Sequence, residues 1–303
     1  MNVRQLEYLD ALARERSFRR AAEECSASQP AVSIAIAKLE GELGVELVHR
    51  HRREAVLTAP GEALLRWARE ALAAVRGLTA EAGHFAGVLT GRLRIGVIPT
   101  ALPAVAGITK SLLTAHPDIH LEIRSLTSDE IVDELSSFRI DAGLTYLDNE
   151  PLGVVASIPV YAESYLYLTA EEVREERFRW GDLDGGRLCL LTPDMQNRRI
   201  VEDVLQRSGA TVTAVVETNS ISALISYVRA GWPSIVPDAW VALYGVPDGM
   251  SAVPLVSPEI SHSVGLVTRV TDLPQPLVKA FVESLGAGAG QPSAGAPRVP
   301  SSP

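Results

Sequence analysis

The chain has 303 residues, of which 47% are hydrophobic, so it is long enough for two or three compact units with a substantial core. It lacks the run of roughly 18 to 20 uncharged apolar residues that a membrane-spanning helix needs. It also lacks a secretory signal, so we expect a cytoplasmic protein. The net charge is −9. Residues 1–58 contain nine basic and nine acidic residues, so the whole negative surplus lies beyond them.

Residues 17–40 predict two short helices joined by a tight turn, preceded by an opening helix whose apolar face completes a three-helix core. The apolar residues recur at helical spacing, as Phe18, Ala21, Ala22 and Cys25 in the first helix of the pair and as Val32, Ile36, Leu39 and Leu43 in the second. Ser17 and Ser28 are the expected N-caps, and Pro30 fits the first turn of the second helix. This is the pattern of a helix-turn-helix.

The other face of the second helix is small and mixed, which suits entry into a DNA major groove; it carries Gln29, Ser33, Ile34, Ala37 and Lys38. Two basic clusters flank this helix, and we expect them to contact phosphates. They are Arg14, Arg16, Arg19 and Arg20 before it, and His49, Arg50, His51, Arg52 and Arg53 after it. The second cluster lies between two short extended stretches, which predicts a hairpin with a basic tip.

The run A-A-x-x-x-x-x-S-Q-P-A-V-S-x-x-I-x-x-L-E, followed by LGVELVHRHRREAVLTAPGEALL, resembles the N-terminal segment of LysR-type transcriptional regulators. The resemblance in layout extends from about residue 1 to residue 286. It implies a winged helix-turn-helix at residues 1–58 that binds double-stranded DNA. The residues implied in DNA contact are Gln29, Pro30, Ser33, Ile34, Lys38, Arg50, Arg52 and Arg53. The alternative for this segment is a three-helix module without a DNA role.

One departure from the family pattern concerns base recognition. Family members often carry Arg or Gln directly after the serine of the reading helix, whereas Ile34 and Ala35 follow Ser33 here. Ile34 lies off the apolar stripe, so we expect it to touch a thymine methyl group rather than to hydrogen-bond a base. Polar readout then falls on Gln29, Ser33 and Lys38.

Residues 59–89 predict a long linker helix that begins at a Thr58 cap. Its apolar seam has heptad-like spacing and consists of Leu65, Ala68, Leu72, Val75, Thr79, Ala82, Ala86 and Leu89, beside a second row of Leu64, Ala71, Leu78 and Phe85. We expect this seam to pack against the same helix of a second subunit, giving a dimer or a tetramer. Packing against the chain's own C-terminal domain is the alternative.

Residues 90–286 alternate between predicted strands and helices, which indicates parallel α/β sheets. The strands are expected at 92–98, 119–126, 142–145, 187–191, 211–216, 234–236 and 263–268, with two extended stretches in 154–167 broken by Pro159. The helices are expected at 102–114, 128–137, 198–207, 220–230 and 274–285. The fold class is therefore α+β and α/β. The layout resembles the family's periplasmic-binding-protein-like effector domain, with lobe I at about 91–160 plus 265–286 and lobe II at about 162–262. The tail, residues 287–303, is expected to be disordered.

Hydroxyl and amide side chains follow several of these strands at the expected starts of helices, where a small polar or anionic effector would bind between the lobes. The candidates are Thr100, Thr127, Ser128, Tyr146, Thr192 and Asn219, with Pro237 on the rim. Each one could instead be only a helix cap. Arg198 and Arg199 could supply charge, although solvation on the helix surface is the expectation for both.

The sequence gives no basis for catalysis, a metal site or a cofactor. The six histidines are scattered, no catalytic motif occurs, and Cys25 and Cys189 are expected to be small buried hydrophobic residues. The expected function is a DNA-binding regulator whose DNA geometry is switched by an effector, on an interrupted inverted repeat. RNA polymerase is a further conceivable partner. An exported solute-binding protein and a co-regulator without its own operator are the alternatives.

Overall fold

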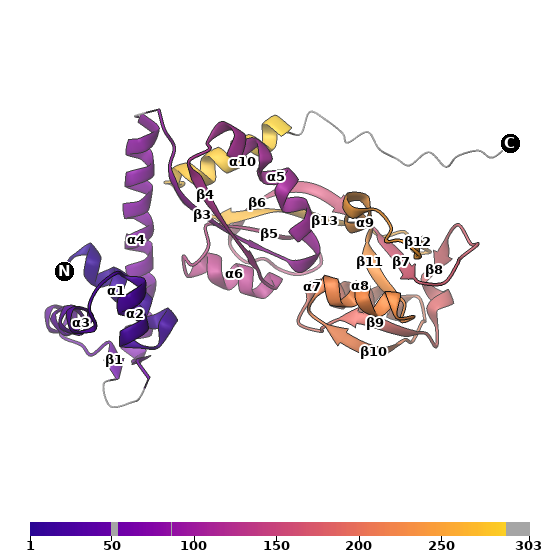
Figure 1. Ribbon diagram of the computed structural model, residues 1–303, viewed down its shortest axis with the longest axis horizontal. Coiled ribbons are helices and arrows are strands. Elements are labelled where there is room, and N and C mark those ends of the chain that lie inside the picture. The colour runs from indigo at the N-terminus through magenta and orange to yellow at the C-terminus, as the bar shows by residue number, and fades with distance from the viewer. Residues whose placement is uncertain (50–53, 86, 289–303) are drawn as a thin grey trace.

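The computed structural model describes residues 1–49, 54–85 and 87–288. Figure 1 shows a small helical head, one long helix standing beside it, and a body of two lobes. The head contains α1 (Val3–Glu15), α2 (Phe18–Glu24) and α3 (Gln29–Leu43). Its strands β1 (Val48–His49) and β2 (Val56–Leu57) pair antiparallel, and the basic tip between them lies outside the described residues.

The caps expected in the head are present. The Ser17 hydroxyl accepts a hydrogen bond from the backbone N–H of Arg20, and the Ser28 hydroxyl accepts one from Ala31. The apolar stripe of α3 is buried except at its end, where Leu43 is exposed, contrary to expectation. Leu43 is the last residue of the helix, and the chain leaves through Gly44 in a left-handed conformation (φ 72°), so the stripe ends one turn earlier than its spacing indicated.

The head is joined tightly to the long helix α4 (Ala59–Phe85). The Thr58 hydroxyl accepts a hydrogen bond from the Gly61 N–H at 3.0 Å, which confirms the expected cap. A Cβ atom at Gly61 would lie 2.2 Å from the carbonyl oxygen of Leu47, so only glycine fits where α4 crosses the wing. The carboxylate of Glu40 accepts from the backbone N–H groups of Leu47 and Val48, at 2.9 and 3.2 Å. These contacts fix the start of the wing to α3.

The seam expected to pair with a second subunit is in large part covered by the chain itself. Leu65, Ala68 and Leu72 are buried in the core of the head, so that part of the expectation is wrong. Farther along, Ala80 is buried in the core of the body. The large apolar residues that α4 exposes are Val75 of the expected seam, Leu78 and Phe85 of the row beside it, and Trp67. The spacing of the seam correctly predicted a buried face for the first part of α4. That face packs against the head of the same chain, and not against a second subunit.

Lobe I is built on a five-stranded sheet of order β4-β3-β5-β13-β6, with β3 (Gly91–Val97), β4 (Ile119–Ser125), β5 (Ala142–Tyr146), β6 (Val155–Glu163) and β13 (His262–Arg269). Strands β4, β3 and β5 are parallel, whereas β13 is antiparallel to both of its neighbours. The helices are α5 (Leu102–Ala115) after a short turn η1 (Pro99–Ala101), α6 (Ser128–Ser136) and α10 (Pro276–Gly288). The sheet is therefore mixed, not purely parallel as expected.

Lobe II has a four-stranded sheet of order β11-β7-β12-β8 and a parallel pair, β10-β9. Its strands are β7 (Tyr165–Thr169), β8 (Phe178–Arg179), β9 (Arg187–Leu191), β10 (Thr213–Thr218), β11 (Ser234–Pro237) and β12 (Ser251–Val256). Its helices are α7 (Gln196–Arg207), α8 (Ile221–Arg229) and α9 (Asp238–Tyr244), with a turn η2 (Trp180–Leu183). The sequence patterns missed β8, β12 and α9.

Pro159 does not break the strand in which it lies, contrary to expectation. Strand β6 is continuous from Val155 to Glu163 and pairs on one side only, with β13. A proline lacks the N–H of a second ladder, and an edge strand does not need one. The chain then crosses into lobe II at Ser164 and returns between β12 and β13. No helix of the described residues is long and apolar enough to cross a membrane.

Candidate functional site

The face of α3 that was expected to read DNA points away from the core of the head. Gln29, Pro30 and Lys38 are exposed, Ser33 is partly exposed, and Ile34 is 69% exposed. Ile34 therefore does not belong to the core of the head, and its apolar side chain is available to a partner. The wing residues Arg50, Arg52 and Arg53 lie outside the described residues.

The first basic cluster is less available to phosphates than its sequence indicated. Arg14 pairs with Glu24 at 2.7 Å, Arg19 pairs with Glu23 at 2.7 Å, and Arg20 pairs with Glu15 at 3.1 Å. These ion pairs are exposed and contribute at most about 1 kcal/mol each, so a phosphate could displace the carboxylates. Three of the four arginines of this cluster are therefore paired in the free protein.

The second candidate site lies between the lobes, where helix starts from both of them meet. A cavity of about 10 Å³ is lined by Thr100, Thr127, Ser128 and Tyr146 of lobe I and by Leu191, Met195, Gln196 and Asn197 of lobe II, with Ile98 and Pro99. A volume of this size holds about one water molecule. Four of the six expected effector residues are thus at one place, and the lobes are closed over them.

Of the hydroxyl groups of Thr100, Thr127 and Ser128, two already have partners. Thr127 is the N-cap of α6, and it forms a full capping box with Glu130. The Ser128 hydroxyl accepts a hydrogen bond from Thr145 at 3.0 Å. Thr100 differs, because its hydroxyl oxygen is buried and has no hydrogen-bond partner in the described part of the chain. It is the hydroxyl of the three that remains free for a ligand.

The N-terminus of α7 is the element that the sequence patterns missed. Its N-cap position is Met195, whose side chain makes no capping hydrogen bond. Gln196 and Asn197 are buried, and within the described residues their backbone N–H groups meet no acceptor. The side-chain oxygen Oε1 of Gln196 is also without a partner. A buried helix start with free N–H groups is a site at which an acceptor-bearing molecule would be stabilised.

Tyr146 connects this cavity to the crossover between the lobes. Its hydroxyl accepts a hydrogen bond from the Asn197 side chain at 2.9 Å and donates one to the Glu163 carboxyl group. Glu163 is buried, and its second oxygen has no partner among the described residues. Burial raises the pKa of Glu163 to about 8, with a further rise from Asp238 and Asp148 and an opposing effect of the Tyr146 hydrogen bond. Glu163 is therefore mostly protonated at neutral pH.

Three contacts hold α7 of lobe II against lobe I. Besides the bond from Asn197 to Tyr146, the Gln196 side chain donates to the carbonyl oxygen of Asp148 at 3.1 Å. Arg199 binds both carboxylate oxygens of Glu150, each at 2.6 Å. The bidentate geometry is the strong form of this ion pair. We call these three contacts the interlobe clamp.

Arg198 and Arg199 at the start of α7 both differ from expectation, because neither is simply solvated. Arg198 is buried and donates to the Leu191 carbonyl oxygen, to Glu217 and to Glu202. Arg199 forms an ion pair with Glu150.

The remaining two effector candidates, Thr192 and Asn219, do not line the cavity. The Thr192 hydroxyl is buried directly after β9 and has no partner among the described residues, and Asn219 is exposed. No charged side chain lines the cavity in the described part of the chain.

Known protein families match the chain over almost its whole length. Residues 3–62 match the model of the bacterial regulatory helix-turn-helix proteins of the LysR family, and residues 86–290 match the model of the LysR substrate-binding domain. The first match ends at the start of α4 and the second begins just after that helix, so together they cover both the head and the body.

Curated relatives give the same result. The chain is 31% identical over 274 residues to the hydrogen peroxide-inducible genes activator of Haemophilus influenzae, covering 89% of this chain and 91% of that protein. The DNA-binding dual regulator OxyR of Escherichia coli is also 31% identical, with 89% and 90% covered. A probable hydrogen peroxide-inducible genes activator of Streptomyces viridosporus is 35% identical over 237 residues, with 76% and 75% covered. These relatives are transcriptional regulators, not enzymes.

Solved structures resemble this fold over the full chain. A full-length OxyR from Pseudomonas aeruginosa, in which a cysteine is replaced by aspartate, superposes with a TM-score of 0.75 at 26% identity and 94% coverage of both chains. The regulator CbnR superposes with a TM-score of 0.68 at 23% identity, covering 96% of this chain and 100% of that one. At this identity, the similarity to CbnR shows a shared fold and nothing about function.

Proposed function

Because this chain belongs to the LysR family of bacterial DNA-binding transcriptional regulators, we propose that α3 contacts the bases of operator DNA. We also propose that an effector bound between the lobes controls how the two heads of an oligomer are positioned on the DNA. A bacterial regulator of this kind acts in the cytoplasm, where the chromosome lies. The proposal for the effector depends on one observation, the buried and uncapped N-terminus of α7 beside the free hydroxyl of Thr100.

For the DNA contact we propose that Gln29, Ser33 and Lys38 hydrogen-bond base edges and that Ile34 touches a thymine methyl group. Pro30, in the first turn of α3, is proposed to lie against the DNA beside them. The exposure of this face and the absence of bulky side chains near the start of α3 support it. Arg50, Arg52 and Arg53 of the wing are proposed as backbone or minor-groove contacts, from the sequence.

For the effector we propose a small molecule that carries both acceptors and donors and at most one negative charge. Its acceptors would meet the N–H groups of Gln196 and Asn197, which the positive end of the α7 dipole also favours. A donor would meet the free Gln196 oxygen. A doubly charged anion is disfavoured because Arg198 and Arg199 are already paired and supply no free cation.

Effector binding requires that the lobes move. The cavity has room for about one water molecule, so a larger ligand has to separate α7 from lobe I and replace the interlobe clamp with contacts of its own. Such a ligand binds the open and closed states with different affinities, which is the condition for switching.

The relatives' names mention hydrogen peroxide, but the thiols of this chain are poorly placed for direct oxidation. The chain has two cysteines. Cys189 is fully buried in β9, and burial raises the pKa of its thiol. Cys25 in the head is partly exposed, contrary to the expectation that it is buried, but its partial burial also raises the pKa of its thiol. Because the thiolate is the reactive form, we propose that this regulator responds to a bound molecule and not to oxidation of its own cysteines.

The effector proposal can be tested by thermal unfolding of the full chain against a set of small neutral and monoanionic metabolites, with dicarboxylates as the charged comparison. We expect a stabilising compound from the first group whose effect disappears in the double variant Thr100→Val with Gln196→Leu. Asn219→Ala, an exposed position outside the cavity, serves as the control and should keep the effect. Stabilisation by dicarboxylates alone, or stabilisation that survives the double variant, would contradict the proposal.

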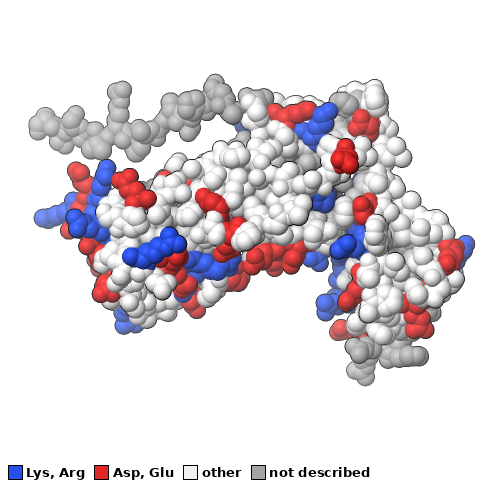
Figure 2. Space-filling model, turned by 180° about the vertical axis from the view of Figure 1, so that it is seen from behind, with Lys and Arg blue, Asp and Glu red and all other residues white. Residues whose placement is uncertain are grey.

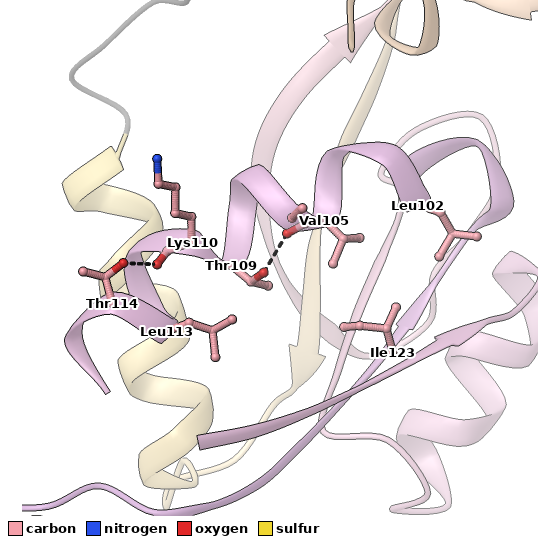
Figure 3. A pocket seen from close by; sticks show the side chains of 8 residues that line it. Leu102, Val105, Thr109, Lys110, Leu113, Thr114 and Ile123 are labelled. Atoms are coloured by element: carbon pink, nitrogen blue, oxygen red, sulfur yellow. Dashed lines mark hydrogen bonds between the residues drawn. The ribbon is translucent and has the colours of Figure 1, made fainter. Parts of the chain in front are cut away.

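We also propose that the chain functions as a dimer or a tetramer, through surfaces that it leaves exposed. One is the stripe of Trp67, Leu78 and Phe85 on α4. The other is a groove of about 600 Å³ between α5 and the edge strand β4, lined mainly by apolar side chains (Figure 3). Sedimentation of the double variant Leu78→Glu with Phe85→Glu should give smaller particles than the unchanged chain. Equal sedimentation would exclude the α4 stripe as an interface.

A further inference from the structure

The chain passes between the lobes at Ser164 and at residues 257–261, which we call the two crossings. Glu163, the last residue of β6, precedes the first crossing, and His262, the first residue of β13, follows the second. These two residues are partners in the ladder between β6 and β13. Ser164 is held by lobe II, because it donates its backbone N–H to the Asp238 side chain and accepts from the Asp238 N–H, both at 2.9 Å. A change in the angle between the lobes must therefore bend the chain beside Glu163.

Glu163 is a buried acid without a cation. Its side chain is 1% exposed, and the Tyr146 hydroxyl donates to one of its oxygens, while the other oxygen, Oε2, has no partner among the described residues. His262 does not neutralise it, because its Nδ1 atom lies 3.0 Å from the carboxylate of Asp148. On the surface of the body, by contrast, acidic and basic side chains are interspersed (Figure 2). A carboxyl group in such an interior is stable as the neutral acid.

Lobe II covers this acid. Asn197 of α7 donates to the Tyr146 hydroxyl at 2.9 Å, so the pair of Tyr146 and Glu163 is the lobe I end of one contact of the interlobe clamp. Tyr165 of β7 lies edge-on to His262, with 6.3 Å between the ring centroids, and His262 lies edge-on to Tyr146 at the same separation. Side chains of both lobes thus enclose the crossings. Separation of the lobes would admit water to Glu163, and water favours the charged carboxylate.

The titratable groups that face Glu163 from the neighbouring elements are two acids, three phenols and one imidazole. They are Asp148 after β5, Asp238 of α9, Tyr146 of β5, Tyr161 of β6 itself, Tyr165 of β7 and His262 of β13. Burial raises the pKa of Glu163 to about 8, with repulsion from both acids and an opposing hydrogen bond from Tyr146. Burial also raises the pKa of each tyrosine, so the phenols keep their protons. Glu163 and His262 are therefore the groups here that can change charge near neutral pH.

We propose that the two crossings form a proton-sensitive hinge, in which Glu163 holds a proton while the lobes are closed and releases it when they separate. The carboxylic O–H bond breaks, the electron pair stays on the carboxylate oxygen, and the proton passes to solvent water. Because the open form is the one that releases a proton, a rise in pH favours opening and a fall in pH favours closure. The proton state of Glu163 acts on the clamp through Tyr146, to which Asn197 is bonded.

The test measures the distance between the lobes in the full-length protein as a function of pH. Spin labels are attached at Ser136→Cys on α6 and Gln206→Cys on α7, two exposed positions, in a chain that also carries Cys25→Ser. Cys189 is fully buried and stays unlabelled. An excess of unlabelled chain restricts the measured distances to pairs within one chain. We expect the ratio of open to closed chains to rise by up to about tenfold per pH unit between about pH 5 and about pH 8, and to level off above that.

Two variants separate the roles of Glu163 and His262. Glu163→Gln keeps an oxygen that accepts from the Tyr146 hydroxyl but has no proton to release, so its distance distribution should be the same at every pH in this range. His262→Gln should keep the dependence on pH. The reverse result, with the dependence lost in His262→Gln and kept in Glu163→Gln, would overturn the proposal.

A weakened clamp brings opening into the measurable range if the unchanged chain stays closed at every pH. Arg199→Gln removes the ion pair with Glu150, which lies away from the crossings, and should raise the open fraction throughout. The open-to-closed ratio in this chain should show the same rise with pH. A distribution that does not change with pH in either chain would overturn the proposal. No effector is added in these measurements, so their outcome is independent of the effector proposed above.

Discussion

The two helix N-termini that we propose as binding sites are built in opposite ways. The start of α3 is exposed, capped by Ser28 and stiffened by Pro30. The start of α7 is buried, and Met195 in its N-cap position gives it no side-chain cap. The first helix keeps its own N–H groups satisfied and offers side chains to a partner. The second leaves the N–H groups of Gln196 and Asn197 without acceptors among the described residues, so we propose that its backbone itself is the binding group.

This difference separates two kinds of recognition. The head is complete without its partner, because its caps, core and wing contacts are all made within residues 1–72. The interlobe site is incomplete, with unpartnered oxygens on Thr100 and Gln196 and a carboxyl group on Glu163 that is neutral only because it is buried. Changes in the head should therefore act on DNA affinity, and changes in the cleft on stability and lobe closure.

The largest effect is expected at Glu163. Its pKa of about 8 lies above the ordinary value of 4.5, so the folded chain keeps a proton that the unfolded chain releases. The free energy of unfolding should then fall as pH rises from about 5 to about 8, by up to about 1.4 kcal/mol per pH unit, and level off above that. Urea unfolding across this range should show a weaker dependence in Glu163→Gln. The exposed Glu259→Gln should keep the full slope; equal slopes in all three would refute the assignment.

The next effect concerns the DNA-reading face. Gln29→Ala combined with Ser33→Ala should weaken binding to a selected operator by about 1–3 kcal/mol for each base that is no longer hydrogen-bonded. Binding to unrelated DNA should change little, because phosphate contacts do not depend on sequence. Titration of both DNAs at two salt concentrations measures this. Equal weakening on both DNAs would show that these residues do not read bases.

A smaller effect is expected from the interlobe clamp. Asn197→Leu removes the donor to the Tyr146 hydroxyl inside a buried cluster, which should destabilise the closed arrangement by about 1–3 kcal/mol. Small-angle scattering of the full chain should report a larger average separation of the lobes. Asn219→Leu, outside the cavity, is the matched control. Equal stability and equal lobe separation in Asn197→Leu and Asn219→Leu would show that the interlobe clamp does not hold the lobes closed.

The smallest effect is expected at the exposed helix start. Ser28→Ala removes the hydroxyl that accepts from the Ala31 N–H and should cost the head about 1 kcal/mol, because water can replace part of the missing bond. Urea unfolding, followed by a spectroscopic probe placed in the head, measures this change in the free energy of unfolding. Specific DNA binding should persist at temperatures well below the midpoint; a loss of binding without a loss of stability would indicate that Ser28 touches DNA.

The sequence by itself determined the local features of this protein. Helical spacing, cap residues and the proline at the start of α3 are read over four to eleven residues, and they located the head, the wing strands and most elements of the body. The tight motif around α3 also carried the family resemblance. These features depend on interactions between near neighbours in the chain, which a sequence pattern contains.

Only the tertiary structure decided which surfaces are covered and which groups meet. The seam of Leu65, Ala68 and Leu72 has the spacing of a dimer helix, but the head fills it, because periodicity identifies a buried face and not its partner. The start of α7 gave no signal, since Met195 is not a capping residue. The pairing of Arg199 with Glu150 joins residues 49 positions apart, and such distant contacts follow from the packing of the two lobes.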